Sequence, residues 1–283
     1  MMKRKSHTIL GMALLFLFAG KAFSALPKGQ FKKVMVVVFE NTDFAVALNQ
    51  PFFAKLAHEG ALLTNFTAEI HPSQGNYIAM ISGDTQGVTN DKTMDLSGKT
   101  LVDLLEAKGK TWKVYLEGYP GNCFTGSISG NYARKHNPFI SFKNIQSNPA
   151  RCSHLVSATQ LNTDVQAGTV PDYSFYVPDL KNDGHDTGAP FADAWYSRTF
   201  GPRLLDPRFM KDLLLVSTFD ESGKGSSGNH VYTSLYGSMV IPASTSGASV
   251  SHYDLLRTIE DGLAIGNLGL NDAQATAVTG IWK

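Results

Sequence analysis

Acidic and amide side chains directly follow three apolar segments of this 283-residue chain, at 34–39, 173–177 and 213–219. If the three segments form neighbouring parallel strands, these polar groups meet at one edge of the sheet. Clustered carboxylates repel one another and are costly to remove from water, and a divalent cation removes that cost. Oxygen donors with an occasional histidine suit Mg²⁺, Ca²⁺, Mn²⁺ or Zn²⁺. The candidate groups are Glu40, Asn41, Asp183, His185, Asp186, Asp220 and Glu221.

A serine in the segment 71–77, HPSQGNY, is the candidate nucleophile. Ser73 stands between a predicted extended segment and a predicted helix, and a helix N-terminus offers free N–H groups and a favourable dipole to a phosphate. Serine is also a good N-cap residue, and the local sequence alone favours that simpler interpretation. The acidic groups have a comparable alternative as ordinary caps of helices and turns, but their occurrence after three strands favours the metal site.

Apolar patterning predicts an alternation of strands and helices along the chain. The segments 34–39 and 213–219 are apolar without interruption, as in strands buried on both faces of a parallel sheet. Further extended segments are predicted at 61–70, 111–116, 173–177 and 238–241, and helices at 51–58, 76–81, 100–108, 193–205 and 253–264. The alternation predicts an α/β fold of three layers, helix–sheet–helix, around a mostly parallel central sheet.

The N-terminus has the pattern of a secretory signal peptide. A basic stretch at 3–5 precedes a short apolar run at 9–18, and small residues at 22–25 supply a cleavage site. The alternative is a membrane anchor, but the run is about half the ~20 residues that a spanning helix needs. We therefore predict export to the periplasm or the cell exterior, removal of residues 1–24, and a single domain over 25–283 without stable membrane insertion.

The two cysteines of the chain, Cys123 and Cys152, both lie in a segment of mostly irregular character at 118–162. An even count in an exported chain predicts a disulfide. In the chain-entropy model such a crosslink stabilises the fold by about 3.5 kcal/mol. Two unrelated buried thiols are the alternative. A catalytic thiol is not indicated, because neither cysteine has a neighbouring motif that suggests one.

Composition and charge limit the classes of partner. Hydrophobic residues make up 43% of the chain and charged residues 17%, which is typical of a globular protein with a sizeable core. The formal net charge is only +1. Charge therefore gives no reason to expect a nucleic-acid partner.

The order of these motifs resembles the bacterial and fungal phosphoesterase family. That family includes secreted acid phosphatases and phosphatidylcholine-type phospholipases C, and it is a branch of the alkaline-phosphatase-like superfamily. The resemblance covers residues 34 to 262 and implies an alkaline-phosphatase-like fold. The segments 134–139, 148–152 and 251–260 resemble the fungal acid-phosphatase branch in particular.

The resemblance implies a metal-dependent reaction with a serine nucleophile. Ser73 would attack phosphorus in line to give a phosphoseryl intermediate, which water then hydrolyses. A bound cation would lower the pKa of the hydroxyl and neutralise charge on the phosphoryl oxygens. The implied metal ligands are Glu40, Asn41, Asp220, Glu221 and the hydroxyl of Ser73.

Other residues are implied to bind the substrate. Asn76 would donate to a phosphoryl oxygen, and His185 would contact the phosphate or protonate the leaving group, since histidine changes charge near neutral pH. Asp183 and Asp186 would orient His185 or bind metal, and the sequence does not separate these roles. His252 would line the pocket.

The sequence departs from the family pattern at several points. Gly75 stands where the fungal pattern often has proline, and Thr42 to Phe44 replace the continuation typical of the phospholipase branch, which favours the acid-phosphatase branch. The number of metal ions stays open, because two-metal members of the superfamily use more histidines. Three further histidines are predicted to be surface or structural residues, and one lysine is a possible phosphate contact. These are His58, His136, His154 and Lys181.

The leading hypothesis is a metal-dependent phosphoesterase that hydrolyses phosphate monoesters, of the acid-phosphatase type. A phospholipase C acting on phosphodiester lipid headgroups uses the same chemistry and is the first alternative. A catalytically silent protein that binds metal or phosphate is the alternative of another class, and retention of Ser73 with all its polar partners argues against it. The expected partner is a small-molecule phosphate ester or a phospholipid headgroup.

Overall fold

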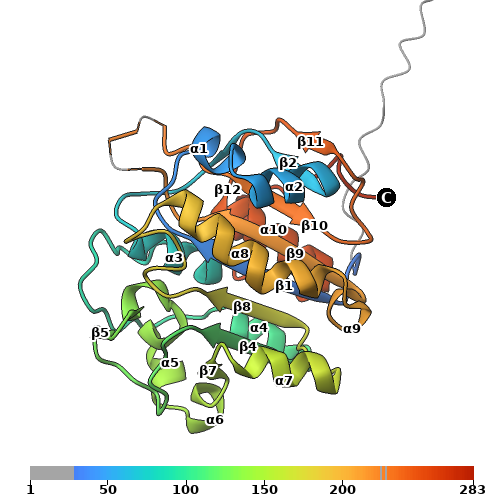
Figure 1. Cartoon of the computed structure of the whole chain (residues 1–283). Coiled ribbons are helices and arrows are strands. Elements are labelled where there is room, and N and C mark those ends of the chain that lie inside the picture. The colour runs from blue at the N-terminus through green and yellow to red at the C-terminus, as the bar shows by residue number, and fades with distance from the viewer. Residues whose placement is uncertain (1–28, 224, 227) are drawn as a thin grey trace, which may run out of the picture.

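An eight-stranded sheet forms the centre of the protein in the computed structural model, which describes residues 29–223, 225–226 and 228–283 (Figure 1). The predicted signal peptide, residues 1–24, lies outside the described residues. The strands of the sheet are β1 (Lys33–Phe39), β2 (Ala61–Leu63), β4 (Trp112–Leu116), β7 (Leu155–Ser157), β8 (Tyr173–Val177), β9 (Leu213–Phe219), β10 (Thr233–Tyr236) and β11 (Ser244–Ser246). Their order across the sheet is β11-β2-β10-β9-β1-β8-β4-β7.

The three strands that precede the candidate ligands are parallel neighbours. β1 lies between β8 and β9, and Val36 is opposite Phe175 on one side and Val216 on the other. Every residue of β9 is buried, as is every residue of β1 except Lys33. The carboxyl ends of the three strands therefore meet at one edge of the sheet. β10 runs antiparallel to β9 and to β2, so the sheet is mostly parallel, as predicted.

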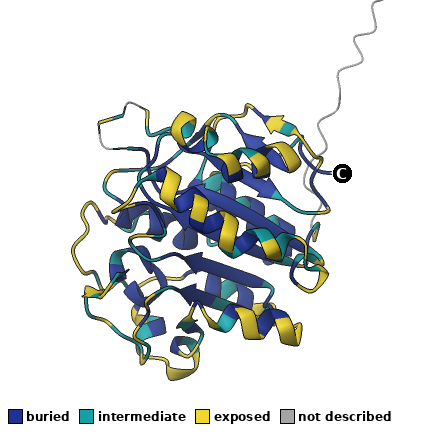
Figure 2. Cartoon of the chain, viewed as in Figure 1, coloured by how far each residue is buried: buried dark blue, intermediate teal, exposed yellow. Residues whose placement is uncertain are grey.

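Helices cover both faces of the sheet, which confirms the three-layer fold (Figure 1). α2 (Pro51–Glu59) packs against α8 (Ala189–Leu204) on one face, and α10 (His252–Leu263) packs against α3 (Gln74–Ser82) on the other. Figure 2 shows buried strands between helices whose residues alternate between buried and exposed, as expected for amphipathic helices. Among the described residues, none of the helices combines the length and the apolar character that crossing a lipid bilayer requires.

Shorter elements complete the chain. The remaining helices are α1 (Phe44–Leu48), α4 (Leu101–Ala107), α5 (Lys143–Gln146), α6 (Pro149–Cys152), α7 (Gln160–Ala167), α9 (Pro207–Met210) and α11 (Asn271–Gln274), with 3₁₀ turns η1 (Arg134–His136) and η2 (Phe139–Ser141). Two small strand pairs lie outside the central sheet: β3 (Phe66–Thr67) with β12 (Val250–Ser251), and β5 (Ile128–Ser129) with β6 (Tyr132–Ala133).

The segment predicted as a strand at 238–241 is not part of the sheet. β10 ends before it and β11 begins after it, and Val240 forms only an isolated bridge with Trp282 near the C-terminus. The apolar residues Met239 and Val240 are nevertheless buried. Apolar character in this short run therefore reflects packing against the C-terminal segment, which a local pattern cannot distinguish from a strand.

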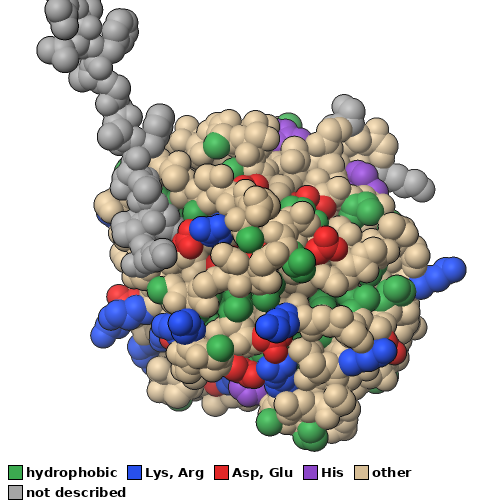
Figure 3. Space-filling model, turned by 180° about the vertical axis from the view of Figure 1, so that it is seen from behind, with side chains coloured by type: hydrophobic (Ala, Val, Ile, Leu, Met, Phe, Trp, Pro, Cys, Tyr) green, Lys and Arg blue, Asp and Glu red, His purple; other side chains and the backbone are tan. Residues whose placement is uncertain are grey.

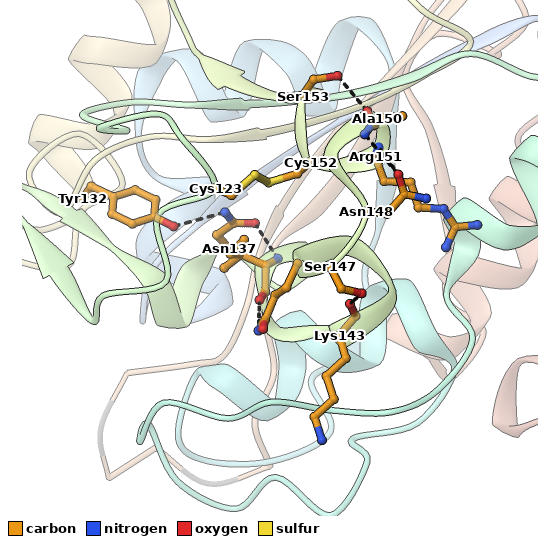
Figure 4. The surroundings of a disulfide bond; sticks show 12 residues. Cys123, Tyr132, Asn137, Lys143, Ser147, Asn148, Ala150, Arg151, Cys152 and Ser153 are labelled. Atoms are coloured by element: carbon orange, nitrogen blue, oxygen red, sulfur yellow. Dashed lines mark hydrogen bonds between the residues drawn. A yellow bond between two sulfur atoms is a disulfide. The ribbon is translucent and has the colours of Figure 1, made fainter.

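The segment 118–162 has more structure than its composition predicts. It contains β5, β6, both 3₁₀ turns, α5, α6 and β7, which pairs with β4 at the edge of the central sheet. A disulfide joins Cys123 to Cys152 in this segment, as predicted (Figure 4). Asn148 caps α6 by accepting hydrogen bonds from two backbone N–H groups, and the Asn137 amide donates to the Tyr132 hydroxyl.

The surface carries charges of both signs. Figure 3 shows Lys and Arg side chains interspersed with Asp and Glu side chains over one face, in keeping with the formal net charge of +1. Among the few large hydrophobic side chains that are exposed are Ile128 at 62% and Ile241 at 40%. Single exposed apolar side chains are common on protein surfaces, but Ile128 borders a hollow described below.

Glu260 in α10 makes the stability of the fold depend on pH. Its side chain is buried, and neither of its carboxylate oxygens has a hydrogen-bond partner among the described residues. Burial, with a further contribution from Asp272, raises the pKa of Glu260 to about 9. Because this folded-state pKa lies above the unfolded value, the contribution to stability is complete below about pH 4.3 and is lost progressively as the pH rises toward 9.

We expect Glu260→Gln to raise the free energy of unfolding at pH 8 by about 2 kcal/mol and to leave it nearly unchanged at pH 4.5. The amide removes the cost of keeping a buried carboxyl protonated at alkaline pH. Urea unfolding at the two pH values measures the effect. Glu59→Gln, at an exposed position in α2, is the matched control. An equal change for Glu260→Gln at both pH values would contradict the assignment.

Candidate active site

The loop after β1 supplies the first two candidate ligands. Glu40 is buried, and its backbone N–H donates to the carbonyl oxygen of Asp183 at 3.0 Å. This bond joins the end of β1 to the loop after β8. Asn41 follows with a φ of 45°, a left-handed conformation that asparagine tolerates better than most residues. The turn brings the Asn41 side chain beside the loop that follows β9.

The hydroxyl of Ser73 lies among these side chains. Ser73 Oγ is 3.0 Å from Glu40 Oε2, 3.1 Å from Glu221 Oε1 and 3.4 Å from Asn41 Oδ1. The residue stands at the N-cap position of α3, but its side chain makes no capping hydrogen bond. The simpler interpretation of Ser73 as an N-cap side chain is therefore wrong.

Gly75 allows the first turn of α3 to pack closely against Ile70 and Val88. A Cβ atom at this position would lie 2.7 Å from Ile70 Cγ2 and 2.8 Å from the Val88 carbonyl oxygen. Both distances are too short for a real contact, so the position requires glycine. The glycine that departs from the fungal pattern thus lets the first turn of α3 pack tightly beside Ser73.

Asp220 and Glu221, which follow β9, complete a cluster of oxygens. The Asn41 backbone N–H donates to Asp220 Oδ1 at 3.3 Å. The amide end of the Asn41 side chain lies 3.1 Å from Glu40 Oε2 and from Glu221 Oε1, and 3.2 Å from Asp220 Oδ1. With its nitrogen inward the amide donates to the carboxylates; with its oxygen inward it adds a further ligand for a cation. On the outer side, Glu221 Oε2 lies 2.5 Å from His71 Nδ1.

His136, predicted to be a surface or structural residue, is buried among the candidate ligands. Its Nε2 lies 3.1 Å from Glu40 Oε1 and its Nδ1 lies 3.3 Å from Asp183 Oδ2. The ring stacks on Tyr77 of α3. Burial lowers the pKa of His136 well below its usual value, which keeps the ring neutral and able to offer a lone pair. The motif at 134–139 was the available signal, but it did not single out the histidine.

The buried acids need a cation or protons. Burial, together with Asp183, raises the pKa of Glu40 well above its usual value, and burial together with Glu40 and Glu221 does the same for Asp220. Although the His136 ring lies close to the first two, Glu40 Oε1, Asp183 Oδ2 and Asp220 Oδ2 form no hydrogen bond with any described residue. Buried carboxylates without partners are costly, and a divalent cation satisfies such oxygens. The buried group of Glu40, His136 and Asp183 could hold a metal ion.

The wall of the site beside Ser73 contains a positively charged side chain, Lys135. Lys135 Nζ lies 3.0 Å from Asp91 Oδ2 and 3.4 Å from His185 Nε2. Burial opposes the charge on Lys135, but Glu40 and Asp91 outweigh it and hold the pKa of the lysine above its usual value. His185 is oriented by Asp186, whose Oδ1 lies 2.7 Å from His185 Nδ1. Of the two roles left open for Asp186, the orientation of His185 fits this contact.

Three residues predicted to bind the substrate do not reach the cavity. The Asn76 amide accepts from the backbone N–H groups of Glu69 and Ile70 and donates to the Ile70 carbonyl, so it holds the segment before Ser73 instead. His252 is fully buried, and its Nε2 lies 2.8 Å from the Asp220 carbonyl oxygen. Asp183 is buried as well, and it accepts from the His185 backbone N–H.

A cavity of about 660 Å³ opens beside Ser73 at the carboxyl edge of the sheet. Ser73, Lys135, His185 and Glu221 line it, and Lys135 is the only Lys or Arg among the described lining residues. A doubly charged anion such as a phosphate ester would thus meet one lysine, two histidines and the buried oxygen cluster. The complete lining is Asn41, His71, Pro72, Ser73, Asp91, Lys135, His185, Glu221, Ser222 and Gly225.

Fold and site together place a serine hydroxyl in an acidic pocket of an α/β protein, next to buried side chains that could hold a metal ion. A family model, that of the Phosphoesterase family, matches residues 47–265. The chain therefore belongs to the Phosphoesterase family, as the order of the motifs implied. The match includes Ser73, Asp220 and Glu221, whereas Glu40 and Asn41 lie just before it.

Sequence similarity to named proteins supports the same family assignment. The chain is 34% identical over 261 residues to the probable acid phosphatase of Kluyveromyces lactis. The aligned region covers 88% of this chain and 62% of the yeast protein. It is 33% identical over 255 residues to the phosphate-repressible acid phosphatase of Penicillium chrysogenum, covering 87% of this chain and again 62% of the relative. The chain thus spans somewhat less than two thirds of these fungal relatives.

A bacterial relative is covered more completely. The chain is 35% identical over 269 residues to the phosphatidylinositol-3-phosphatase of Mycobacterium tuberculosis, covering 93% of this chain and 86% of the relative. Among solved structures, an alkaline phosphatase superfamily protein from Vibrio parahaemolyticus matches with a TM-score of 0.60 at 14% identity, covering 89% of this chain and 72% of that one. This confirms the alkaline-phosphatase-like fold.

Proposed function

We propose that the protein is a metal-dependent phosphoesterase that hydrolyses phosphate monoesters through a phosphoserine intermediate. The observation that carries the proposal is the position of Ser73 Oγ, which contacts Glu40, Asn41 and Glu221 instead of capping α3. Buried carboxylates clustered around a serine hydroxyl repel one another unless a cation joins them, and the hydroxyl is then placed as a nucleophile. Relatives named acid phosphatase and phosphatidylinositol-3-phosphatase support the same class of reaction.

The oxygen cluster around Ser73 would hold the divalent cation. Its donors are carboxylate, amide and hydroxyl oxygens, which suit Mg²⁺, Ca²⁺, Mn²⁺ or Zn²⁺. Such a cation, when bound, lowers the pKa of a hydroxyl and neutralises charge on phosphoryl oxygens. His136 and Asp183 form a second set of donors that shares Glu40 with the first. The ligands that we assign to the cation are Glu40, Asn41, Ser73, Asp220 and Glu221.

The side chains that line the cavity have separate roles in the reaction. Ser73 Oγ passes its proton to the carboxylate of Glu221 and forms the bond to phosphorus, while the bond from phosphorus to the leaving oxygen breaks. His185, held by Asp186, donates a proton to that oxygen, so the product leaves as an alcohol. In the second step His185 accepts a proton from the water that attacks phosphorus, the bond from phosphorus to Ser73 Oγ breaks, and Oγ regains its proton from Glu221. Lys135 binds a phosphoryl oxygen and balances its charge, a role that the sequence did not predict.

Two other functions would use the same residues. A phospholipase C would cleave a phosphodiester lipid headgroup with the same nucleophile, and a silent protein would bind metal or phosphate without turnover. We favour the monoesterase because Lys135 and two histidines face the cavity, which provides for the second charge of a monoester. The disulfide between Cys123 and Cys152 supports an exported location, periplasmic or extracellular.

Hydrolysis of two chromogenic esters tests the proposal. We expect p-nitrophenyl phosphate to be cleaved from acidic to neutral pH, with at least about a hundredfold loss of rate after treatment with a chelator and recovery on addition of a divalent metal. Preference for p-nitrophenyl phosphorylcholine would indicate the phospholipase C. No cleavage of either ester in the presence of added metals would contradict a phosphoesterase with broad specificity and favour the silent binding protein.

A further inference from the structure

A second, smaller hollow opens beside the cavity that contains Ser73. Its volume is about 270 Å³, and it shares Asp91, Lys135 and His185 with the main cavity as a common wall. The two hollows are therefore adjoining spaces on either side of the Lys135–His185 pair. The part of its lining that belongs to the side hollow alone is largely uncharged and includes Thr93, Ile128, Ala133 and Leu180.

The charged groups of the side hollow are already paired. Arg134 is 3% exposed, and its guanidinium donates to Asp95 Oδ1 at 2.6 Å and to the carbonyl oxygens of Met94 and Thr125. Lys135 is held by Asp91 on the wall that the two hollows share. Among the described residues of the side hollow, no unpaired lysine or arginine is thus left for a second anionic group. An uncharged occupant fits this lining best.

Ile128 provides the apolar edge of the side hollow. It lies on the hairpin formed by β5 and β6, and 62% of its surface is exposed. An apolar ligand that covers such a side chain gains free energy roughly in proportion to the area removed from water. Ala133 from the same hairpin and Leu180 from the loop after β8 face the same space. Two segments distant in sequence therefore form one apolar surface.

We propose that the side hollow binds the alcohol portion of the substrate, and that this portion is uncharged and apolar, about the size of one aromatic ring. The inference rests on the proposed function, because it places the leaving oxygen next to His185. His185 lies on the wall that both hollows share. A group attached to the leaving oxygen at that wall enters the side hollow, where Ile128 and Leu180 contact it.

Binding of two non-hydrolysable analogues tests this subsite without relying on turnover. Phenylphosphonate and methylphosphonate both carry the charged group of a monoester, but only the first has a ring for the side hollow. We expect the metal-loaded protein to bind phenylphosphonate about tenfold more tightly, as measured by calorimetry, and Ile128→Ser to reduce this ratio to about twofold. Leu180→Ala tests the opposite wall in the same way. Ile241→Ser, at another exposed isoleucine, should leave the ratio unchanged.

Hydrolysis of phenyl phosphate and glycerol 2-phosphate provides the second measurement. Ile128→Ser should lower the ratio of the two kcat/KM values about fivefold, because the comparison between variants cancels the chemical difference between the leaving groups. An equal loss of kcat/KM for both esters in Ile128→Ser would overturn the subsite. Equal affinity for both phosphonates in the unaltered protein would overturn it as well. If neither ester is hydrolysed but the preference for phenylphosphonate holds, the subsite stands and the proposed function fails.

Discussion

Ser73→Ala is expected to lower kcat for p-nitrophenyl phosphate by at least about 10⁴-fold. Removal of a nucleophile from a hydrolase that forms a covalent intermediate has effects of this size, because the remaining groups cannot replace the bond to phosphorus. The folded state should persist. Ser73 Oγ contacts only the groups of the site, and its side chain does not cap α3.

The control for this prediction is a serine away from the site. Ser153→Ala removes an exposed hydroxyl beside the disulfide and should keep the activity of the unaltered protein. Acid quenching during turnover should yield a phosphorylated peptide that contains Ser73 in the unaltered protein and not in Ser73→Ala. Near-normal activity of Ser73→Ala, with unchanged thermal unfolding, would exclude Ser73 as the nucleophile.

Asp220→Asn is expected to lower kcat/KM by about 10³-fold and to reduce the amount of divalent metal that copurifies with the protein. The aspartate is fully buried in the oxygen cluster, and Asp220 Oδ2 has no partner among the described residues. Loss of one negative ligand weakens the hold on a cation, and the cation carries much of the charge stabilisation during phosphoryl transfer. Metal content by mass spectrometry and kcat/KM with added metal measure the two effects.

The same strand offers a matched control. Asp212 lies before the amino end of β9, whereas Asp220 follows its carboxyl end. Asp212 has a φ of 59°, which asparagine also tolerates, so Asp212→Asn changes the same charge without straining the backbone. It should retain both metal and activity. Normal metal content in Asp220→Asn, together with loss of metal in Asp183→Asn, would shift the ion to the group of Glu40, His136 and Asp183.

Much of the fold could be predicted from local patterns. The segments 34–39 and 213–219 form β1 and β9, and the predicted helices at 51–58 and 253–264 form α2 and α10. Uninterrupted apolar runs indicate doubly covered strands, and helical spacing of apolar residues indicates one buried face. β7 was missed because it is a three-residue edge strand inside a segment rich in polar and turn-forming residues. A strand of three residues is too short to show a recognisable apolar pattern. β7 is identified as a strand mainly by its pairing with β4.

The candidate ligands were predictable for a related reason. Glu40 and Asp220 stand directly after apolar strands, so their place at the sheet edge follows once those strands are parallel neighbours. Ser73 is different, because a serine before a helix is equally compatible with capping. Its assignment depended on the order of motifs along the chain, and the geometry then showed a hydroxyl directed at carboxylates.

The roles of His136, Lys135, Asn76 and His252 required the folded structure. His136 contacts residues at positions 40 and 183, and no local pattern connects those positions. Asn76 and His252 are near the site, but their polar atoms are taken up by the backbone around it. Residue type and position along the chain identify groups that are able to do chemistry. Long-range contacts decide which of these groups face the cavity and which support its walls, because burial and hydrogen-bond partners are set by segments far apart in the sequence.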